Sequence, residues 1–483
     1  MTINTPDWVK HAVFYQIFPD RFARTARRPL PPSMQVPLEA WDTAPTLQGY
    51  KGGDLWGVAE QLDYLQELGI TAIYFTPIFI SASNHRYHTH DYYVVDPLLG
   101  GNEAFFDLLE AAHRRNMKVV LDGVFNHASR GFFFFNDILE NGPNSPWLNW
   151  FKIQGWPLSA YDGERPANYQ GWWNNRALPE FNHDNDQARE YIMQVGEYWI
   201  EQGVDGWRLD VPFEITVEGF WQEFRSRVKA INPKAYIVGE VWEDSSQWLD
   251  GTQFDGVMNY LFTGPALAFA AQQHITMPLV EPVGYFPYPA LDAKGYAEKI
   301  ESLLNLYDWE IQQTQLNLLS SHDVARVLSV VGEDAASMTL ATLLLLTFPG
   351  APSIYYGDEV GLSGGLDPDC RWAFPAEEKW NTDLLQLHKK LIALRHAHPA
   401  LRTGKYQTLA AEGHCYVFSR LLESEMVVVA INAGTQAVQV RLADMSVDNG
   451  QVLYGDGAVE WLGDRTAMLT IPARTGMVLG SDE

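Results

Sequence analysis

Cysteine is almost absent from the chain, since only Cys370 and Cys415 occur in 483 residues. Two cysteines cannot build a disulfide framework, and their spacing is not that of a metal site. A secretory signal pattern is also missing, because "MTINTPDWVKHAVFYQIF" has no basic segment followed by an apolar stretch and a cleavage site. The longest apolar run, "LATLLLLTF" at 340–348, is too short to cross a bilayer. We therefore expect a cytoplasmic protein without membrane contact.

Basic residues are also few, because 34 lysines and arginines stand against 60 acidic residues and give a formal net charge of -26. Such a chain repels nucleic acid and anionic membranes, whereas a neutral ligand is not affected. Aromatic residues make up 13% of the chain and include 17 tryptophans. Flat rings with a polar edge suit neutral sugars, although large cores also use them. The composition therefore excludes nucleic acid and membranes as partners and favours a neutral ligand.

Short β-branched or aromatic runs alternate with amphipathic segments along most of the chain. The segments with apolar residues three and four apart include 57–69, 102–116, 186–203 and 337–348. The apolar runs lie at 12–18, 71–77, 118–124, 204–210, 236–240, 254–260, 315–321 and 351–357. Eight strand-then-helix repeats predict an α/β fold, a (β/α)₈ TIM barrel.

Two parts of the chain depart from this repeat. About sixty residues rich in Trp, Phe, Asn, Gly and Pro follow the third run, far more than a usual strand-to-helix loop. After "LIALRHAHPAL" apolar and polar residues alternate without helical segments, which predicts an antiparallel β-sandwich. We therefore expect a first barrel part at 1–125, an inserted subdomain over the barrel mouth at 126–185, a second barrel part at 186–402, and a C-terminal β-sandwich at 403–483.

The stretch "VDGWRLDVPFE" at 204–214 places two charged residues in a strand that otherwise reads as buried. Side chains alternate along a strand, so Arg208 and Asp210 share one face while Trp207 and Leu209 share the other. If the apolar pair faces the helices, the charged pair points into the barrel near its C-terminal mouth. A buried ion pair without catalytic use remains an alternative on this stretch alone.

Other predicted strands end in acids at the same level. Strand three ends at Asp122, strand five at Glu240, and strand seven runs into His322 and Asp323. Active sites of TIM barrels are assembled from the C-terminal ends of strands, so the carboxyl groups of strands four, five and seven, those of Asp210, Glu240 and Asp323, should converge. Like charges that converge raise at least one pKa, which is typical of a functional site.

Two carboxyl groups that flank a bond, one ionised and one protonated, are what glycoside hydrolysis needs. Asp210, held ionised by Arg208, suits the nucleophile. Glu240, beside the bulky Val241 and Trp242 of its own segment, suits the general acid and base, because desolvation beside an apolar ring keeps a carboxylic acid protonated. Asp323 would then bind sugar hydroxyls and favour the oxocarbenium-like transition state.

On these residues the chain resembles the α-amylase family of glycoside hydrolases over essentially its whole length. The segments "DGVFNH", "GWRLDVPFE", "GEVW" and "LLSSHD" match four segments of that family in order and spacing. The resemblance implies a retaining mechanism on α-glucosidic bonds. It also implies Asp210 as nucleophile, Glu240 as acid/base and Asp323 as transition-state stabiliser, with Arg208 orienting the nucleophile.

The same resemblance implies further substrate-binding residues around the sugar at the cleavage point. The expected set is Tyr87, which stacks on that sugar, Asp91 of the same segment, His127 and His322, which bond its hydroxyls, and the pair Asp367 and Arg371 at its far edge. Trp242 next to the acid/base is a candidate sugar platform. Trp172 and Trp173 are further candidates, whereas the run Phe132–Phe135 fits the core of the insertion better.

"LPEFN" at 178–182 and "QFDGVMNY" at 253–260 are most similar to the cyclomaltodextrinase, neopullulanase and maltogenic amylase group. That resemblance implies cleavage of α-1,4 and also α-1,6 links in maltooligosaccharides, cyclodextrins, pullulan or branched maltodextrins, with some transfer to sugar acceptors. The group usually carries an additional β-domain before the barrel, whereas "PDWVKHAVFYQIF" begins the first strand almost at once. We expect no such domain, which leaves open a homodimer built through another surface.

We expect no organic cofactor and no metal. The loop after the first strand, "ARTARRPLPP", is basic and has no cluster of oxygen ligands for calcium, and Asn126 fits a structural role better than a calcium ligand. Two alternatives to the hydrolase remain. One is a glucanotransferase acting on maltooligosaccharides, and the other is a catalytically inactive carbohydrate-binding relative, against which the complete set of three carboxyl groups argues.

Overall fold

The computed structural model describes residues 3–25, 35–284, 289–443, 445 and 450–480. Eight parallel strands form its central sheet, and each lies within one of the eight predicted runs. The strands are β1 Phe14–Ile17, β2 Ala72–Phe75, β5 Lys118–Gly123, β6 Gly206–Leu209, β7 Tyr236–Gly239, β8 Gly256–Val257, β9 Leu316–Leu318 and β10 Ala351–Tyr355.

The sheet closes on itself. Its order is β8-β7-β6-β5-β2-β1-β10-β9, and a parallel bridge between Met258 and Leu316 joins the two outer strands. Nearly every residue of these strands is buried, as expected where a parallel sheet is covered on the outside by helices and filled on the inside by side chains. The predicted (β/α)₈ barrel is confirmed.

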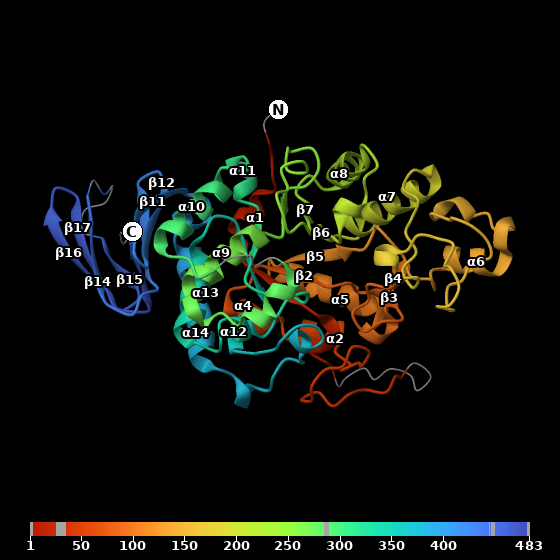
Figure 1. The fold of residues 1–483 in the computed structure, drawn as a ribbon, viewed down its shortest axis with the longest axis horizontal. Helices are drawn as coiled ribbons and strands as arrows, with labels where there is room; N and C mark the ends of the chain where they lie inside the picture. Colours follow the sequence, from red (N-terminus) through yellow and green to blue (C-terminus); the bar gives the residue numbers. More distant parts are fainter. Residues whose placement is uncertain (1–2, 26–34, 285–288, 444, 446–449, 481–483) are drawn as a thin grey trace.

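Helices surround the barrel (Figure 1). The longer ones are amphipathic or wholly buried: in α5, for example, Phe105, Leu108 and Leu109 lie on the buried face. The helices are α1 Asp7–His11, α2 Pro19–Phe22, α3 Leu55–Glu60, α4 Leu62–Leu68, α5 Gly101–Arg114, α7 Asp186–Glu201, α8 Phe220–Ile231, α9 Tyr260–Ala271, α10 Ala293–Leu304, α11 Trp309–Gln312, α12 Val327–Val330, α13 Ala335–Thr347, α14 Thr382–Ala397 and α15 Pro399–Thr403.

The single helix predicted at 57–69 is wrong in its boundaries. Asp54 caps the first helix by accepting from Gly57 N, so α3 begins two residues earlier. Gln61, with φ -98° and ψ 2°, interrupts the helix and separates α3 from α4, which ends at Gly69 in the left-handed region. The two helices still cover one stretch of the barrel with their apolar residues.

The segment after β5 projects away from the barrel at the end opposite to the C-terminal strands (Figure 1). It contains α6 Phe133–Asn141 and short bridges that pair His127 with Glu180, Phe151 with Phe181, and Ile153 with Tyr169. A hairpin of β3 Phe79–Ser81 and β4 Thr89–Val95 lies beside it. Aromatic packing fills the segment: Phe132 lies against Phe181 and Phe135 is fully buried, as expected for core residues. The expectation is wrong for Phe133 of the same run, which is 64% exposed.

The residues after α15 form two antiparallel sheets. One has the order β11-β12-β13-β18-β15 and the other β14-β17-β16. Their bounds are β11 Lys405–Glu412, β12 Cys415–Leu422, β13 Glu425–Asn432, β14 Val438–Leu442, β15 Gln451–Tyr454, β16 Ala458–Gly463, β17 Thr466–Ile471 and β18 Thr475–Gly480. Apolar side chains of both sheets share one cluster, including Val417, Leu469 and Met477. The residue boundaries given above for the four parts remain predictions.

Within the described residues, no helix combines the length and the apolar character that a bilayer crossing requires.

Candidate active site

One buried guanidinium, that of Arg208, forms ion pairs with four carboxyl groups of the site. Arg208 is 0% exposed and its Nη1 donates to Asp210 Oδ1 at 2.9 Å and to Asp122 at 3.0 and 3.1 Å. Its Nη2 lies 3.0 Å from Glu240 Oε2 and 3.9 Å from Asp323 Oδ2. The structure therefore brings the three predicted catalytic carboxyl groups together around Arg208, and adds a fourth.

Strand register explains this gathering. In the parallel ladder, Asp122 of β5 is the partner of Arg208 of β6, and Val238 of β7 follows at the same level. Asp210 follows β6 and Glu240 follows β7, so both leave the barrel at its C-terminal end. Trp207 lies on the other face, where its Nε1 donates to Gly196 O of α7, as the alternation of β6 predicts.

Glu240 accepts two hydrogen bonds in addition to its ion pair with Arg208. Val211 N donates to its Oε2 at 3.2 Å, and the indole Nε1 of Trp242 donates to its Oε1 at 3.2 Å. Val211 has φ 35° and ψ 50°, a left-handed conformation that is rare for a β-branched residue. Trp242 also stacks on Tyr260 with 4.1 Å between ring centres. The indole thus contacts the acid directly, which a sugar platform alone does not require.

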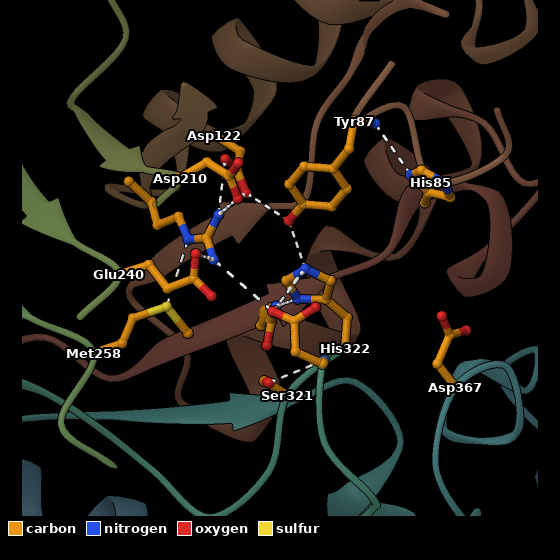
Figure 2. A network of polar contacts seen from close by, with 12 residues as sticks. His85, Tyr87, Asp122, Asp210, Glu240, Met258, Ser321, His322 and Asp367 are labelled. Carbon is orange, nitrogen blue, oxygen red and sulfur yellow. Dashed lines mark hydrogen bonds and ion pairs between the residues drawn. The ribbon is translucent and has the colours of Figure 1, made fainter. Parts of the chain in front are cut away.

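A chain of hydrogen bonds leads from the barrel interior to Asp122. The amide Nε2 of Gln16 donates to Nδ1 of His322 at 2.7 Å, so the neutral ring carries its proton on Nε2. That nitrogen bonds the hydroxyl of Tyr87, and the hydroxyl donates to Asp122 Oδ2 at 3.0 Å. The rings of Tyr87 and His322 lie parallel within 6°. Tyr87 and His322 are therefore fixed beside the carboxyl cluster, as Figure 2 shows.

Asp367 and Arg371 form the rim next to Asp323. Their ion pair measures 3.0 Å, and Arg371 Nη2 lies 3.8 Å from Asp323 Oδ1. Arg371 also donates from Nε to the backbone oxygen of His322 at 3.0 Å. The expected pair is therefore joined to the cluster, with the Asp323 side chain 28% exposed between it and Arg208.

Two predicted residues, His127 and Asp91, make their contacts elsewhere within the described residues, without a hydrogen bond or ion pair to the four carboxyl groups. His127 follows β5, is 1% exposed, and packs its ring on Trp172 at 5.1 Å. Asp91 lies within β4, where its Oδ1 accepts from Tyr93 N at 2.8 Å. Within the described residues, no hydrogen bond or ion pair joins Asp91 to the cluster. The Asp91 carboxylate accepts a hydrogen bond from the backbone of its own strand instead. Its proposed contact with the substrate therefore has no support from this geometry.

Electrostatics of the cluster follow from burial. Desolvation raises the pKa of Asp122 to about 6 and raises the pKa of Asp210 well above its ordinary value. Burial likewise raises the pKa values of Glu240 and Asp323, and Arg208 opposes all four shifts. The expectation that Arg208 holds Asp210 ionised is therefore weakened, because one guanidinium is shared by four acids that repel one another. Around them, burial lowers the pKa of His322 and that of His127, the latter to about 3, so both rings are neutral.

Several contributors were not selected from the sequence. Asp122 was recognised only as a strand end, although its place in "DGVFNH" was a usable signal. Gln16 and Val211 gave no signal, since their roles depend on register and on backbone conformation. His85 also lies on this rim, where Nδ1 accepts from Tyr87 N at 3.2 Å (Figure 2).

The described residues were expected to hold no metal site. No group of three or more His, Cys, Asp or Glu side chains there is arranged around a common metal position. Asn126 is fully buried and its Nδ2 lies 3.4 Å from His127 Nδ1. Most of the basic loop "ARTARRPLPP" lies at 26–34, outside the described residues, so the expected lack of calcium there stays a prediction.

Comparison with known families decides the kind of protein. A family profile described as "Alpha amylase, catalytic domain" matches residues 16–370, and one described as "Alpha-amylase C-terminal domain" matches residues 404–479. The chain belongs to the α-amylase family. It is thus a member of a glycoside hydrolase family, and the resemblance inferred from the four segments is confirmed.

Individual relatives of this α-amylase family member are similar over most of its length. Neopullulanase 2 of Thermoactinomyces vulgaris is 42% identical over 435 residues, which are 89% of this chain and 70% of that protein. The solved structure of the debranching enzyme from Nostoc punctiforme is 64% identical, covers 100% of both chains and has a TM-score of 0.93. Cyclic α-maltosyl-(1→6)-maltose hydrolase from Arthrobacter globiformis, in complex with its cyclic sugar, is 34% identical with a TM-score of 0.87, over 99% of this chain and 100% of that chain.

Proposed function

We propose that this protein is a retaining α-glucan hydrolase that cleaves α-1,4 and α-1,6 glucosidic bonds in maltooligosaccharides, cyclodextrins, pullulan or branched maltodextrins. The observation that carries the proposal is the single guanidinium of Arg208, which holds Asp210 and Glu240 within 2.9 and 3.0 Å of its two terminal nitrogens. A retaining glycoside hydrolase needs two such carboxyl groups, one as the nucleophile and one as the general acid and base.

The reaction follows from the roles of these two groups. Asp210 attacks the anomeric carbon while Glu240, kept protonated by burial, gives its proton to the departing glycosidic oxygen. Glu240 then removes a proton from water, whose oxygen displaces Asp210 from the glycosyl-enzyme. Asp323, within reach of both Arg208 and Arg371, is suited to bind hydroxyls of the reacting sugar.

Substrate range is inferred from the relatives. Neopullulanase, cyclomaltodextrinase and maltogenic amylase are names of relatives at 42%, 42% and 39% identity. The debranching enzyme and the hydrolase of a cyclic sugar with α-1,6 links match nearly the whole chain. These names support α-1,6 as well as α-1,4 cleavage. The ratio of glucose to products longer than maltotriose, measured on maltotriose, separates hydrolysis from transfer.

The decisive test uses two conservative variants. Asp210→Asn and Glu240→Gln each should lower turnover of pullulan and β-cyclodextrin by at least about 10³-fold, because each removes a group that acts only in the transition state. Melting temperatures should stay close to that of the wild type. Proton NMR of the first product formed should show the α-anomer. Near-normal turnover in either variant, or a β-anomer, would contradict the mechanism.

We further propose that the protein acts in the cytoplasm as a homodimer. The intracellular maltogenic amylase of Bacillus subtilis, 35% identical over 92% to 93% of this chain, supports the location. Light scattering during size-exclusion chromatography measures the mass of the assembly, and a monomer at micromolar concentration would contradict a stable dimer.

A further inference from the structure

Three aromatic rings form a stack that leads away from the carboxyl cluster. His127 and Trp172 lie with ring centres 5.1 Å apart and planes within 19°, and Trp172 and Trp173 with centres 4.7 Å apart and planes within 14°. His127 is 1% exposed, whereas Trp173 is 79% exposed. We name these three rings the aromatic stack. It runs from the protein interior to solvent, and its last ring offers a free face.

The residue that carries the outer ring, Trp173, has a strained backbone conformation. Trp173 has φ 49° and ψ 35°, and the next residue, Asn174, has φ 59°. Asn adopts the left-handed region readily, but a bulky residue there is strained. An exposed indole at a strained position gains neither burial nor backbone stability, and strain of this kind gathers at ligand-binding sites.

The turn that carries the two tryptophans is held by backbone hydrogen bonds. Trp172 N donates to Leu178 O at 3.0 Å and Asn174 N donates to Gly171 O at 2.9 Å. Gly171 itself pairs with Pro179, and a Cβ at this glycine would lie 2.3 Å from Asn175 O. A ligand that stacks on a ring held in this way orders little on binding, so less affinity is lost to conformational entropy.

Contacts connect the aromatic stack to the cleavage site. The imidazole of His127 lies beside the backbone of Tyr87, and the Tyr87 hydroxyl reaches Asp122 in the cluster. His127 Nε2 and Trp172 Nε1 are buried, and within the described residues neither has a hydrogen-bond partner. A buried polar group without a partner calls for an explanation, and a bound ligand or water is one.

We propose that Trp173 is an outer sugar-binding platform on which the α-glucan chain stacks beyond the sugar at the cleavage point, with Trp172 fixing the plane of the platform. This inference rests on the proposed function, because it takes Tyr87 and His127 to border that sugar. The occupant is a neutral glucan chain, because the aromatic stack continues the site at which the glucan is cleaved. The protein's net charge of -26 does not repel a neutral ligand. The platform selects for length, because only a chain several units long reaches it.

The test is isothermal titration calorimetry with maltotriose and maltoheptaose, with every protein, the wild type included, carrying Glu240→Gln so that neither sugar is cleaved during the titration. Trp173→Ala should weaken maltoheptaose binding on the order of tenfold and leave maltotriose binding within about twofold, because one stacking contact is lost. Trp173→Gly should lose as much affinity for maltoheptaose as Trp173→Ala does. It should melt at a higher temperature than Trp173→Ala, because glycine is not strained at positive φ. Trp173→Phe should restore part of the affinity.

Phe133→Ala is the matched control. Phe133 is 64% exposed on the same insertion, but its ring lies against Phe134 and Trp147 and not in the aromatic stack. It should bind both sugars like the wild type. Equal losses for both sugars in Trp173→Ala, no loss for either, or no binding by the wild type would overturn the platform. Failure of the proposed function would instead appear as wild-type binding without turnover by the protein that keeps Glu240.

Discussion

At the scale of single residues, the central fact is that Arg208 serves four carboxyl groups at once. A buried guanidinium can neutralise one ionised acid, and each further ionised acid in the same space costs free energy. The cluster therefore retains protons to higher pH than free carboxyl groups do, as the raised pKa values of Asp210, Glu240 and Asp323 indicate. Retaining catalysis needs such a site, with one proton kept and one carboxylate free.

Asp122 acts on the ionisation of Asp210 in two ways. Its charge raises the pKa of Asp210, and it also shares Nη1 of Arg208 with Asp210. Asp122→Asn should lower the pKa of Asp210 on both counts. Activity rises as Asp210 ionises, so the acid limb of the kcat/KM profile should move to lower pH, by about one unit.

Asp358→Asn is the control for this shift, because it removes a buried acid that pairs with Arg326 instead of Arg208. The acid limb of that variant should coincide with the limb of the wild type. An acid limb that stays in place in Asp122→Asn, or moves to higher pH, would show that Asp122 does not set the ionisation of the nucleophile.

Residue-level prediction from the sequence succeeded where one strand decides the outcome. Alternation along β6 placed Arg208 and Asp210 on the inner face and Trp207 on the outer face. The sequence could not predict that Asp122 shares the guanidinium of Arg208, because that contact depends on the register between β5 and β6. Asp91 was selected with its segment, whereas the pairing of β3 with β4 directs its carboxylate to its own backbone.

At the scale of elements, the strands were predictable because a parallel sheet buried on both faces requires apolar runs. Helix boundaries were less so, as the interruption at Gln61 shows. The insertion was found by its length and composition, but the turn at 171–178 was not, because it is built from backbone bonds that the sequence does not display. Contacts that join one element to another are equally hard to predict from the sequence, and a residue of α14 is an example.

Arg395 of α14 ties several elements together without an acidic partner among the described residues. It is 0% exposed, and it donates to the backbone oxygens of Leu346, Phe348, Leu401 and Gly350. Three of these carbonyls follow or end α13, and one belongs to α15. The guanidinium thus satisfies carbonyls that a helix leaves unpaired at its C-terminal end.

Arg395→Met should destabilise the protein by at least about 3 kcal/mol, because several buried carbonyls lose their donor together. Lys390→Met on the exposed face of the same helix should change stability by less than about 0.5 kcal/mol. The measurement is the midpoint and slope of equilibrium urea unfolding. A loss in Arg395→Met no larger than that of the control would show that the carbonyls find other partners.

At the scale of the whole molecule, burial of acidic side chains links folding to pH. Desolvation raises the pKa of Asp358 to about 6 and that of Glu359 to about 7, and both lie in a 3-10 turn after β10. The active-site acids are shifted in the same direction. A raised pKa means that the folded chain binds a proton that the unfolded chain has released, so stability falls as pH rises through this range.

Glu359 isolates this effect from catalysis. It accepts hydrogen bonds from the hydroxyls of Tyr15 and Tyr64, each at 2.7 Å, and in the described part of the chain no basic side chain forms an ion pair with it. Its pKa is about 7 when folded and about 4.5 when unfolded, so its contribution is fully present below pH 4.5 and is lost as pH rises through 7.

The wild type should therefore lose up to about 3 kcal/mol of unfolding free energy between pH 4.5 and 8 through this one group, since one pKa unit corresponds to about 1.4 kcal/mol. Glu359→Gln cannot ionise and should show a correspondingly smaller loss, whatever its stability at pH 5. Glu67→Gln, on the exposed face of α4, should behave like the wild type. Guanidinium unfolding at pH 5, 6.5 and 8 measures all three proteins. Parallel curves for Glu359→Gln and the wild type would mean that Glu359 keeps an ordinary pKa in the folded protein and that the acids of the active site carry the pH dependence instead.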